Sequence, residues 1–220
     1  MVNPYDQADP SSQLDSDTES RILDAAHRVF VLRGTAGARM QEVADEAGVN
    51  KALLHYYFRS KDRLAEAVFA RVARALFVPM VGLLASDLPL EEKVRSVVAH
   101  ELEHLSRSPF LPGYMLSEMQ HYPERLPQLI ASAAGMSPEH IRERLLGGLR
   151  AQIEERVRAG TMRPIDAEQF LVNLVSLCVF PFAAQPMVRL VLGLGEQGFR
   201  DFIEARKTQL AEFFLQAVRP

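Results

Sequence analysis

The residues best suited to chemistry form the segment His-Glu-Leu-Glu-His near the middle of the chain. On a helix, His100 and His104 would face the same side one turn apart, which suits two zinc ligands, with Glu101 as the general base of a hydrolase. Glu124 follows at a spacing that some zinc peptidases use for a third ligand. With His121, the two histidines also suit a metal or effector site. Histidines that only pack or are solvated remain the more frequent explanation of such a pattern.

A second group of polar residues surrounds a glycine turn. Two short helices are predicted at about residues 39–47 and 52–57, with Gly48 in the turn between them and Asn50 as the cap of the second helix. This spacing indicates a helix-turn-helix, whose second helix enters the major groove of DNA. On periodicity alone, a helical hairpin with a solvated basic face explains the pattern equally well.

The second of these helices carries side chains suited to a nucleic acid. Its apolar residues Val49, Leu54 and Phe58 can face inward. The residues then left outside are Asn50, Lys51, Ala52, Leu53, His55 and Tyr57. Basic residues outnumber acidic ones in the segment that begins at Lys51 and ends at Arg63, and cations around one helix favour contacts with phosphates.

The segments around both groups are predicted to be helical. Ser16 and Glu19 fit a capping box for a helix that runs to Gly34, and Ser60 is expected to begin a helix that runs towards Pro79. Beyond Pro79 the expected helices are 90–107, 112–120, 123–133, 138–159, 167–183 and 198–217. Because no segment shows convincing strand alternation, the predicted fold class is all-α.

Composition limits the classes of protein to consider. The chain has 220 residues, of which 48% are hydrophobic and 24% are charged, so it can bury a sizeable core. The single cysteine, Cys178, excludes an internal disulfide and fits a reducing compartment. The net charge of -3 argues against a uniformly basic coat. The first residues lack a secretory pattern, and 170–184 is too short to span a membrane, so we expect a cytoplasmic protein.

Charge and proline content divide the chain into three parts. Residues 1–17 are acidic and polar and contain no Lys or Arg, which predicts a disordered arm. Residues 18–68 are expected to form the small helix-turn-helix module. Residues 69–220 are expected to form a larger helical domain.

The N-terminal motifs resemble the tetracycline-repressor (TetR) family. The similar stretches are Ile22-Leu-Asp-Ala-Ala-His-Arg-Val-Phe, Val43-Ala-Asp-Glu-Ala-Gly-Val and Leu54-His-Tyr-Tyr-Phe-Arg-Ser-Lys-Asp-Arg-Leu. They cover residues 18–68 almost without a gap, and their order and spacing are specific. The resemblance implies a three-helix DNA-binding domain followed by a helical domain for effector binding and dimerisation. It also implies a homodimeric repressor, not an enzyme, that a small-molecule effector releases from a palindromic operator in double-stranded DNA.

The resemblance assigns roles to residues of the first domain. Gln41 and Lys51 match positions that contact base edges in the family, and Ala52 and Leu53 would pack near base edges or thymine methyl groups. The positions that match phosphate contacts are His55, Tyr57 and Lys61. Members of the family often have Thr where this chain has Ala38, Gly or Pro where it has Ala52, and Tyr where it has His55. Arg39 is expected to replace the lost threonine contact with a phosphate contact.

A cluster of large, adaptable side chains indicates a site for the effector. Methionine and aromatic residues line permissive apolar pockets, although they fill ordinary cores more often. The expected lining is His100, His104, Phe110, Tyr114, Met115, Met119, His121, Tyr122, Phe170, Asn173 and Leu177. This composition suggests a mainly apolar ligand, such as a fatty acyl, aromatic or drug-like molecule. We expect no required cofactor and no metal, with His100 and His104 as the weak metal candidates.

Two C-terminal helices are expected to pair with those of a second subunit. The helix at 167–183 is apolar over more than one face, which predicts burial on two sides. The expected dimer contacts are Phe170, Leu174, Cys178, Phe199, Phe202, Leu210, Phe213 and Phe214. The alternative is the core of a single chain. Two functional alternatives also remain: the zinc-dependent hydrolase, and a helical interaction module that does not bind DNA.

Overall fold

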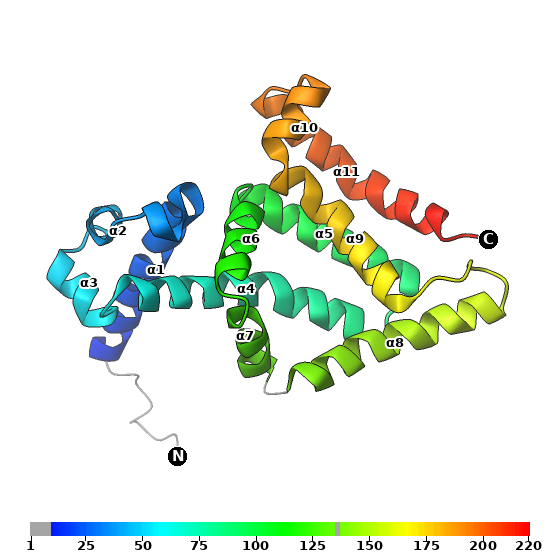
Figure 1. Cartoon of the computed structure of the whole chain (residues 1–220), viewed down its shortest axis with the longest axis horizontal. Coiled ribbons are helices and arrows are strands. Elements are labelled where there is room, and N and C mark those ends of the chain that lie inside the picture. The colour runs from blue at the N-terminus through cyan, green and yellow to red at the C-terminus, as the bar shows by residue number, and fades with distance from the viewer. Residues whose placement is uncertain (1–9, 135–136) are drawn as a thin grey trace, which may run out of the picture. The chain divides into compact units, whose positions relative to one another are not determined.

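The computed structural model describes residues 10–134 and 137–220, and in that part of the chain helices joined by turns and loops are present without strands. Two compact units are formed, residues 1–71 and residues 72–220. The sequence placed this boundary after residue 68. Figure 1 shows the order of the helices along the chain.

The first unit contains α1 (Pro10–Gly37), α2 (Met40–Ala47), α3 (Lys51–Tyr57) and the start of α4 (Lys61–Ala85). Its core is made by fully buried apolar residues of all four helices, which include Ile22, Ala26, Phe30, Val43, Ala44, Leu54 and Leu64. Gly34 interrupts α1 with a φ of 70°, close to where the sequence predicted that helix to end. The glycine supplies a conformation that other residues rarely adopt.

The predicted disordered arm and the capping box at Ser16 are wrong for residues 10–17, which form the first turns of α1. A contact from a distant part of the chain helps to hold this segment, because Asp15 accepts a hydrogen bond from Tyr57. Composition cannot reveal such a contact. The rest of the predicted arm, residues 1–9, lies outside the described residues.

Helix α4 continues through Pro79 to Ala85 instead of ending near the proline. Proline removes one backbone hydrogen bond from a helix. Here Leu76, Met80 and Leu84 are all buried on one side of α4, and this apolar burial outweighs the lost bond. The end of α4 is also capped, because the buried Lys93 donates from Nζ to the carbonyl of Leu84 at 2.9 Å. Burial lowers the pKa of Lys93.

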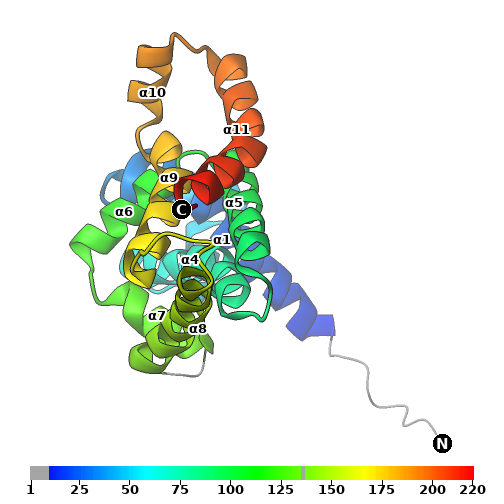
Figure 2. The same ribbon diagram turned by 90° about the vertical axis from the view of Figure 1, so that its right-hand side faces the viewer.

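The second unit is built from α5 (Leu90–Arg107), α6 (Leu111–His121), α7 (Arg125–Ala134), α8 (Pro138–Arg158), α9 (Ala167–Ala183), α10 (Gln185–Leu192) and α11 (Glu196–Ala217). The predicted spans 90–107 and 167–183 match α5 and α9 at both ends. Helix α10 was missed, although a proline in its first turn and Gly193 after its end are ordinary boundary signals. It connects α9 to α11, which run in opposite directions (Figures 1 and 2).

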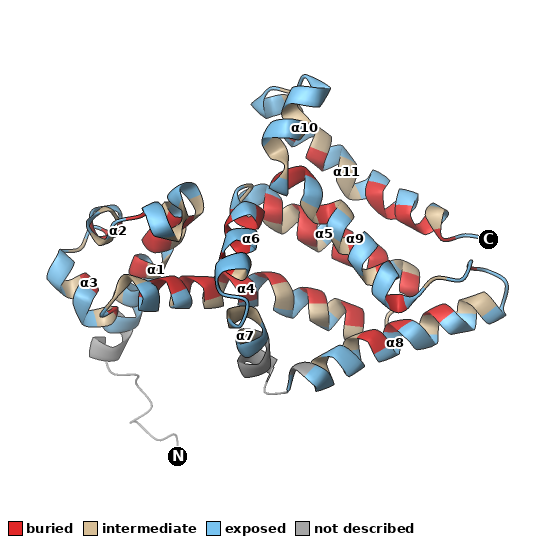
Figure 3. Ribbon diagram, in the orientation of Figure 1, coloured by how far each residue is buried: buried red, intermediate tan, exposed pale blue. Residues whose placement is uncertain are grey.

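The core of the second unit lies where α5 packs against α9 and α11. Buried residues line the facing sides of these helices (Figure 3). Phe170 of α9 meets Phe214 of α11 edge-on, with ring centroids 4.9 Å apart. Aromatic pairs of this geometry add to the free energy gained by burying their area.

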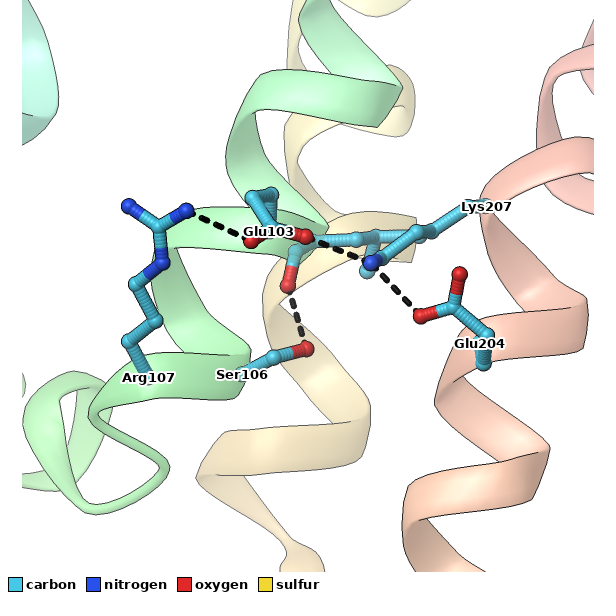
Figure 4. Close-up of polar contacts among 6 residues, drawn as sticks. Glu103, Ser106, Arg107, Glu204 and Lys207 are labelled. Carbon is cyan, nitrogen blue, oxygen red and sulfur yellow. Dashed lines mark hydrogen bonds and ion pairs between the residues drawn. The ribbon is translucent and has the colours of Figure 1, made fainter.

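An ionic network joins α5 to α11 on the outside of this core (Figure 4). Lys207 donates from Nζ to Glu103 and to Glu204, each at 2.6 Å. Arg107 also binds Glu103, at 2.7 Å. These contacts lower the pKa of Glu103, and the hydrogen bond from Lys207 is their largest part. The carboxylate of Glu103 therefore links α5 to α11 through Lys207.

Helix α4 is long and apolar enough to cross a membrane by length and composition alone, and α9 with α10 would pass the same test as one bent pair. Core helices of soluble proteins also pass this test. In α4 the buried residues include Leu64 and Val68 in the first unit and Leu76 and Leu84 in the second. Of the apolar 18-residue window of α4, 39% is buried within the protein.

Candidate functional site

The turn between α2 and α3 forms as the sequence predicts. Gly48 ends α2 with a φ of 65°, and its N–H donates to the carbonyl of Asp45 at 3.2 Å. Asn50 then begins α3, because its side-chain oxygen accepts the N–H of Leu53 at 2.8 Å. The predicted helix-turn-helix is therefore present, with local hydrogen bonds at both sides of its turn.

Buried and ionic contacts fix this motif to α1. Leu54 is fully buried and anchors α3, while Val43 and Ala44 anchor α2. Two ion pairs join α1 to α2: Arg28 with Glu46 at 2.7 Å and Arg33 with Glu42 at 2.6 Å. Exposed pairs of this kind contribute at most about 1 kcal/mol each, so the buried residues carry most of the stability.

The outer face of α3 is polar, aromatic and cationic. Lys51, Ala52 and His55 are exposed, as predicted, whereas Leu53 and Tyr57 are half-buried. Tyr56, which is not among the predicted contacts, is 74% exposed and meets Tyr57 edge-on. Tyr56 lies between His55 and Tyr57, which were both predicted to be exposed, and this position could have indicated that Tyr56 is exposed too. This face can offer cations and hydrogen-bond donors to phosphates and base edges.

The Tyr57 hydroxyl already has a partner in the free protein. It donates to Oδ1 of Asp15 in α1 at 2.8 Å. The hydrogen bond to that carboxylate is the largest cause that raises the pKa of Tyr57. A DNA phosphate that accepts a hydrogen bond from the Tyr57 hydroxyl must therefore displace the carboxylate of Asp15.

Three more of the predicted DNA contacts lie outside α3. Arg39 is exposed just before α2, and the backbone N–H of Arg39 donates to Glu42 at 3.1 Å. Gln41 is exposed, with its side-chain amide bonded to Asp45 at 2.8 Å. Lys61 donates to the carbonyl groups of Ala36 and Ala38, at 3.2 and 3.3 Å. Lys61 thus holds the start of α4 to the end of α1, a structural role that the sequence did not predict.

The second unit contains a cavity of about 450 Å³ whose walls come from α4, α5, α6, α7 and α9. Its wall is mostly apolar, with Met80, Met115 and Met119 among its residues. Of the described residues that line it, Glu101 is the charged one, and Ser176 is the other with a polar side chain. Small-molecule sites typically have this volume and this balance of apolar and polar groups.

Glu101 is buried in this cavity wall with one carboxyl oxygen unpaired among the described residues. It is 1% exposed, and its Oε1 has no hydrogen-bond partner among the described residues. Burial raises the pKa of Glu101 to about 7. A buried polar group left without a partner costs about 1–3 kcal/mol, so its retention in a wall of apolar residues calls for a reason.

The predicted effector residues are spread over several places. Met115 and Met119 line the cavity of Glu101. Asn173 and Leu177 line a different hollow, beside Arg206, and Phe110 lines a third. The prediction missed the contribution of α4 because it took the helix to end near Pro79.

The remaining predicted effector residues do not line these hollows. Tyr114 is buried on α6, and Phe170 is in the core against Phe214. His121 is exposed at the end of α6, and the ring of Tyr122 lies 3.6 Å under the guanidinium of Arg125. The rings of Phe170 and Tyr122 each pack against a neighbouring side chain, Phe214 and Arg125 respectively.

The two histidines of the zinc-like motif stack on each other, with ring centroids 6.1 Å apart. The described residues contain no group of three or more His, Cys, Asp or Glu side chains that could hold a metal ion. Burial, followed by the charges of His100 and Arg107, lowers the pKa of His104. Glu101, the third member of the motif, lies in the wall of the apolar cavity instead.

Most of the predicted dimer contacts are buried inside the single chain. This set comprises Phe170, Leu174, Cys178, Phe199, Leu210 and Phe214, and the prediction is wrong for them. One face of α9 packs on elements of the same chain, and periodicity cannot distinguish such packing from packing on a partner. Phe202 is half-buried, and Phe213 is 63% exposed. Burial raises the pKa of Cys178 to about 12, which fits the predicted packing role.

Comparison with known protein families points to one family. Residues 22–68 match the model of bacterial regulatory proteins, tetR family. Over 208 residues the chain is 26% identical to the HTH-type transcriptional regulator RutR of Escherichia coli K12, covering 90% of this chain and 89% of RutR. It is 28% identical over 150 residues to the HTH-type transcriptional regulator BetI of Rhizobium meliloti, covering 66% of this chain and 72% of BetI.

Solved structures share the fold. The ketosteroid transcriptional regulator KstR2 of Mycobacterium tuberculosis has a TM-score of 0.64 and 14% identity, over 92% of this chain and 95% of that one. The regulator FadR of Bacillus subtilis, solved with stearoyl-CoA, has a TM-score of 0.60 and 16% identity, over 91% and 99%. At these identities the likeness establishes the all-α architecture and nothing finer.

Proposed function

The chain belongs to the tetR family of bacterial regulatory proteins, and from that premise we propose that it is a homodimeric repressor released from a palindromic operator by an apolar effector. It is a DNA-binding transcriptional regulator with a helix-turn-helix. The proposal adds the dimer, the form of the operator and the release by a ligand. The exposed face of α3, between two capped ends, is the observation that carries it.

The DNA contacts of the proposal come from the motif around α3. Lys51 and His55 are exposed on α3, and Gln41 and Arg39 are exposed at the start of α2. In a helix-turn-helix the N-terminal residues of the second helix approach base edges, which assigns the base contacts to Lys51 and its neighbours. Arginine, histidine and tyrosine side chains around them suit phosphate contacts.

The dimer of the proposal rests on symmetry and on an exposed apolar surface. An operator with two half-sites requires a protein with a two-fold axis. On α9 and α11 the side chains of Val172, Phe180 and Phe213 are 58%, 52% and 63% exposed. A second copy that packs on these helices would remove this apolar surface from water.

Release by an effector would act through α4. This helix supplies Lys61, which is bonded to the end of α1, and also Phe77 and Met80, which line the cavity. A ligand that favours one position of α4 would favour one separation of the two recognition helices. DNA binding needs a separation of roughly 34–36 Å, so a small preference for another separation weakens it.

Selection of random DNA duplexes by the purified protein tests the proposed DNA binding. We expect enrichment of one palindrome, with an affinity that falls roughly a thousandfold or more between about 50 and 200 mM salt. Replacement of Lys51 by Ala should weaken binding by roughly tenfold or more without unfolding the protein. Arg158→Ala is the charge-matched control, because Arg158 is exposed on α8 in the second unit. Failure to enrich any sequence at low salt would overturn the proposal.

The proposed regulator requires no metal or cofactor. Elemental analysis of the tag-free protein tests this against the zinc-dependent hydrolase. Near-stoichiometric zinc that is lost in the His100→Ala variant would favour the hydrolase, because a zinc peptidase binds its metal through such side chains. Zinc far below one atom per chain is the expected result.

A further inference from the structure

The cavity of Glu101 combines two features that rarely occur together. Its wall consists almost entirely of apolar side chains from α4, α5, α6, α7 and α9. Glu101 is nevertheless placed in that wall, 1% exposed, with Oε1 unbonded among the described residues. Packing alone does not explain this residue, because Gln or Leu would fill the same position without burying an acid.

Among the residues that the structure describes, no group makes a hydrogen bond to Oε1 of this carboxyl. Glu103, two residues along, is bonded to Lys207 and Arg107 on the outside of α5 (Figure 4). Arg206, which is half-buried on α11, donates instead to the carbonyl of Leu177 at 3.0 Å. Thus Lys207 and Arg107 bond to Glu103. The hydrogen bond of Arg206 goes to a backbone carbonyl, although its Nε has no partner among the described residues. Glu101 lies in the cavity wall.

We propose that the effector is an apolar molecule with one basic nitrogen, whose protonated amine binds Glu101 while its apolar body fills this cavity. This inference rests on the proposed function and specifies the ligand class of the same pocket. A protonated amine supplies both missing elements, a hydrogen-bond donor for Oε1 and a positive charge. Charge-assisted hydrogen bonds are roughly twice as strong as neutral ones, and surroundings of low polarity strengthen them further.

The remainder of the wall suits the rest of such a ligand. A volume of about 450 Å³ accommodates a molecule of ordinary drug size. The methionines Met80, Met115 and Met119 can adapt to aliphatic or aromatic groups. An anionic ligand with its charge at this position would meet Glu101 without a balancing cation in the described wall. The site therefore selects amines over acids of the same shape.

Three soluble probes of one shape test the proposal: 4-phenylbutylamine, 4-phenylbutanol and 4-phenylbutyrate. Each is titrated calorimetrically into the full-length protein at neutral pH. We expect the amine to bind roughly tenfold or more tighter than the alcohol, and the acid to bind weakest. In Glu101→Gln the affinity for the amine should fall by roughly the same factor, with little change for the alcohol.

Glu92→Gln is the matched control, because Glu92 is an exposed glutamate in the first turn of the same helix. It should leave all three affinities unchanged. The order of the affinities of the three probes for the wild-type protein tests the proposal even if the Glu101→Gln variant does not fold. An amine that binds no tighter than the alcohol, or an acid that binds tightest, would overturn the proposal.

A further measurement separates this inference from the proposed function. The amine is added to the wild-type protein bound to its selected DNA, and the affinity for that DNA is measured. We expect the amine to weaken the DNA complex of the wild type and of Glu92→Gln, and to leave that of Glu101→Gln intact. If the protein selects DNA but the amine has no effect on the complex, the ligand class is wrong and the DNA-binding function stands.

Discussion

The hydrogen bond between Tyr57 and Asp15 places an acidic side chain at the end of the recognition helix. A carboxylate there repels phosphates and occupies the hydroxyl that would bind one. We expect Asp15→Asn to tighten binding to the selected DNA by roughly two- to fivefold at low salt, because it removes the charge. Fluorescence anisotropy of a labelled duplex measures the change.

Asp17→Asn is the control for this effect, because Asp17 is exposed in the same turn of α1 and carries the same charge. If both variants tighten binding equally, the general charge of the segment acts and the bond to Tyr57 does not. Weaker DNA binding by Asp15→Asn would instead show that the carboxylate orients Tyr57 for its phosphate.

Glu101 makes the stability of the protein depend on pH. Its pKa is raised from 4.5 to about 7 in the folded state, so the folded protein binds more protons than the unfolded chain between these values. The free energy of unfolding must therefore fall as the pH rises through this range, and it changes little from this group below or above it. The total loss is about 3 kcal/mol.

Comparison with Glu101→Gln isolates this contribution. Urea denaturation at several pH values should show the wild type losing stability relative to the variant as the pH rises from 4.5 to 7. His104 is present in both proteins, and Cys178, with its pKa of about 12, stays neutral over this range. A constant difference between the two proteins would contradict the raised pKa of Glu101.

At the residue scale, the sequence predicts what depends on near neighbours. Gly48 and Asn50 were assigned from turn and cap preferences that operate over a few residues, and both have the expected geometry. The partner of Tyr57 lies 42 positions away, and no local preference identifies it. The sequence suggests Glu101 only as the general base of an alternative zinc hydrolase, because residue spacing does not tell which side of a helix faces a cavity.

At the element scale, glycine conformation decides where α2 ends. Gly48 has a φ of 65°, and an added Cβ would meet nothing within 4 Å, so the cost of Gly48→Ala is backbone strain alone. We expect a loss of about 1 kcal/mol in the free energy of unfolding. Gly82→Ala is the matched control, since Gly82 lies inside α4 with open space and ordinary helical φ.

The control should change stability in the opposite direction. Alanine favours a helix interior over glycine by up to about 1 kcal/mol, so Gly82→Ala is expected to stabilise the protein. Chemical denaturation followed by circular dichroism measures both variants. Equal effects of the two substitutions would mean that the left-handed turn after α2 is not required.

The ends of a helix were predictable where a regular apolar face ended at residues that commonly begin or end helices. Helix α5 begins after Pro89 and has a regular buried stripe, and its predicted ends agree with the structure. Helix α4 was cut short at Pro79 because the penalty of a proline is visible in a sequence, whereas the burial of Met80 and Leu84 that offsets it is not. Because the predicted helix ended near Pro79, the residues of α4 that line the cavity were not predicted.

At the scale of the whole molecule, the proposed repressor must pair through the surface that the single chain leaves apolar. Phe213 on α11 is 63% exposed, and Phe180 on α9 is 52% exposed. We expect Phe213→Asp to convert the dimer to a monomer, because an interface would bury the new charge without a partner. Analytical ultracentrifugation measures the molar mass over a range of protein concentrations.

Leu190→Asp provides the matched control, because Leu190 on α10 is 82% exposed and is not part of the proposed interface. It should remain a dimer. A monomeric repressor holds one half-site at a time, so Phe213→Asp should also lose the tight binding of the full palindrome and keep the weak binding of a single half-site. Loss of the dimer only in the Leu190 variant would move the interface to α10, and a monomeric wild type that still binds the palindrome tightly would contradict the two-fold model.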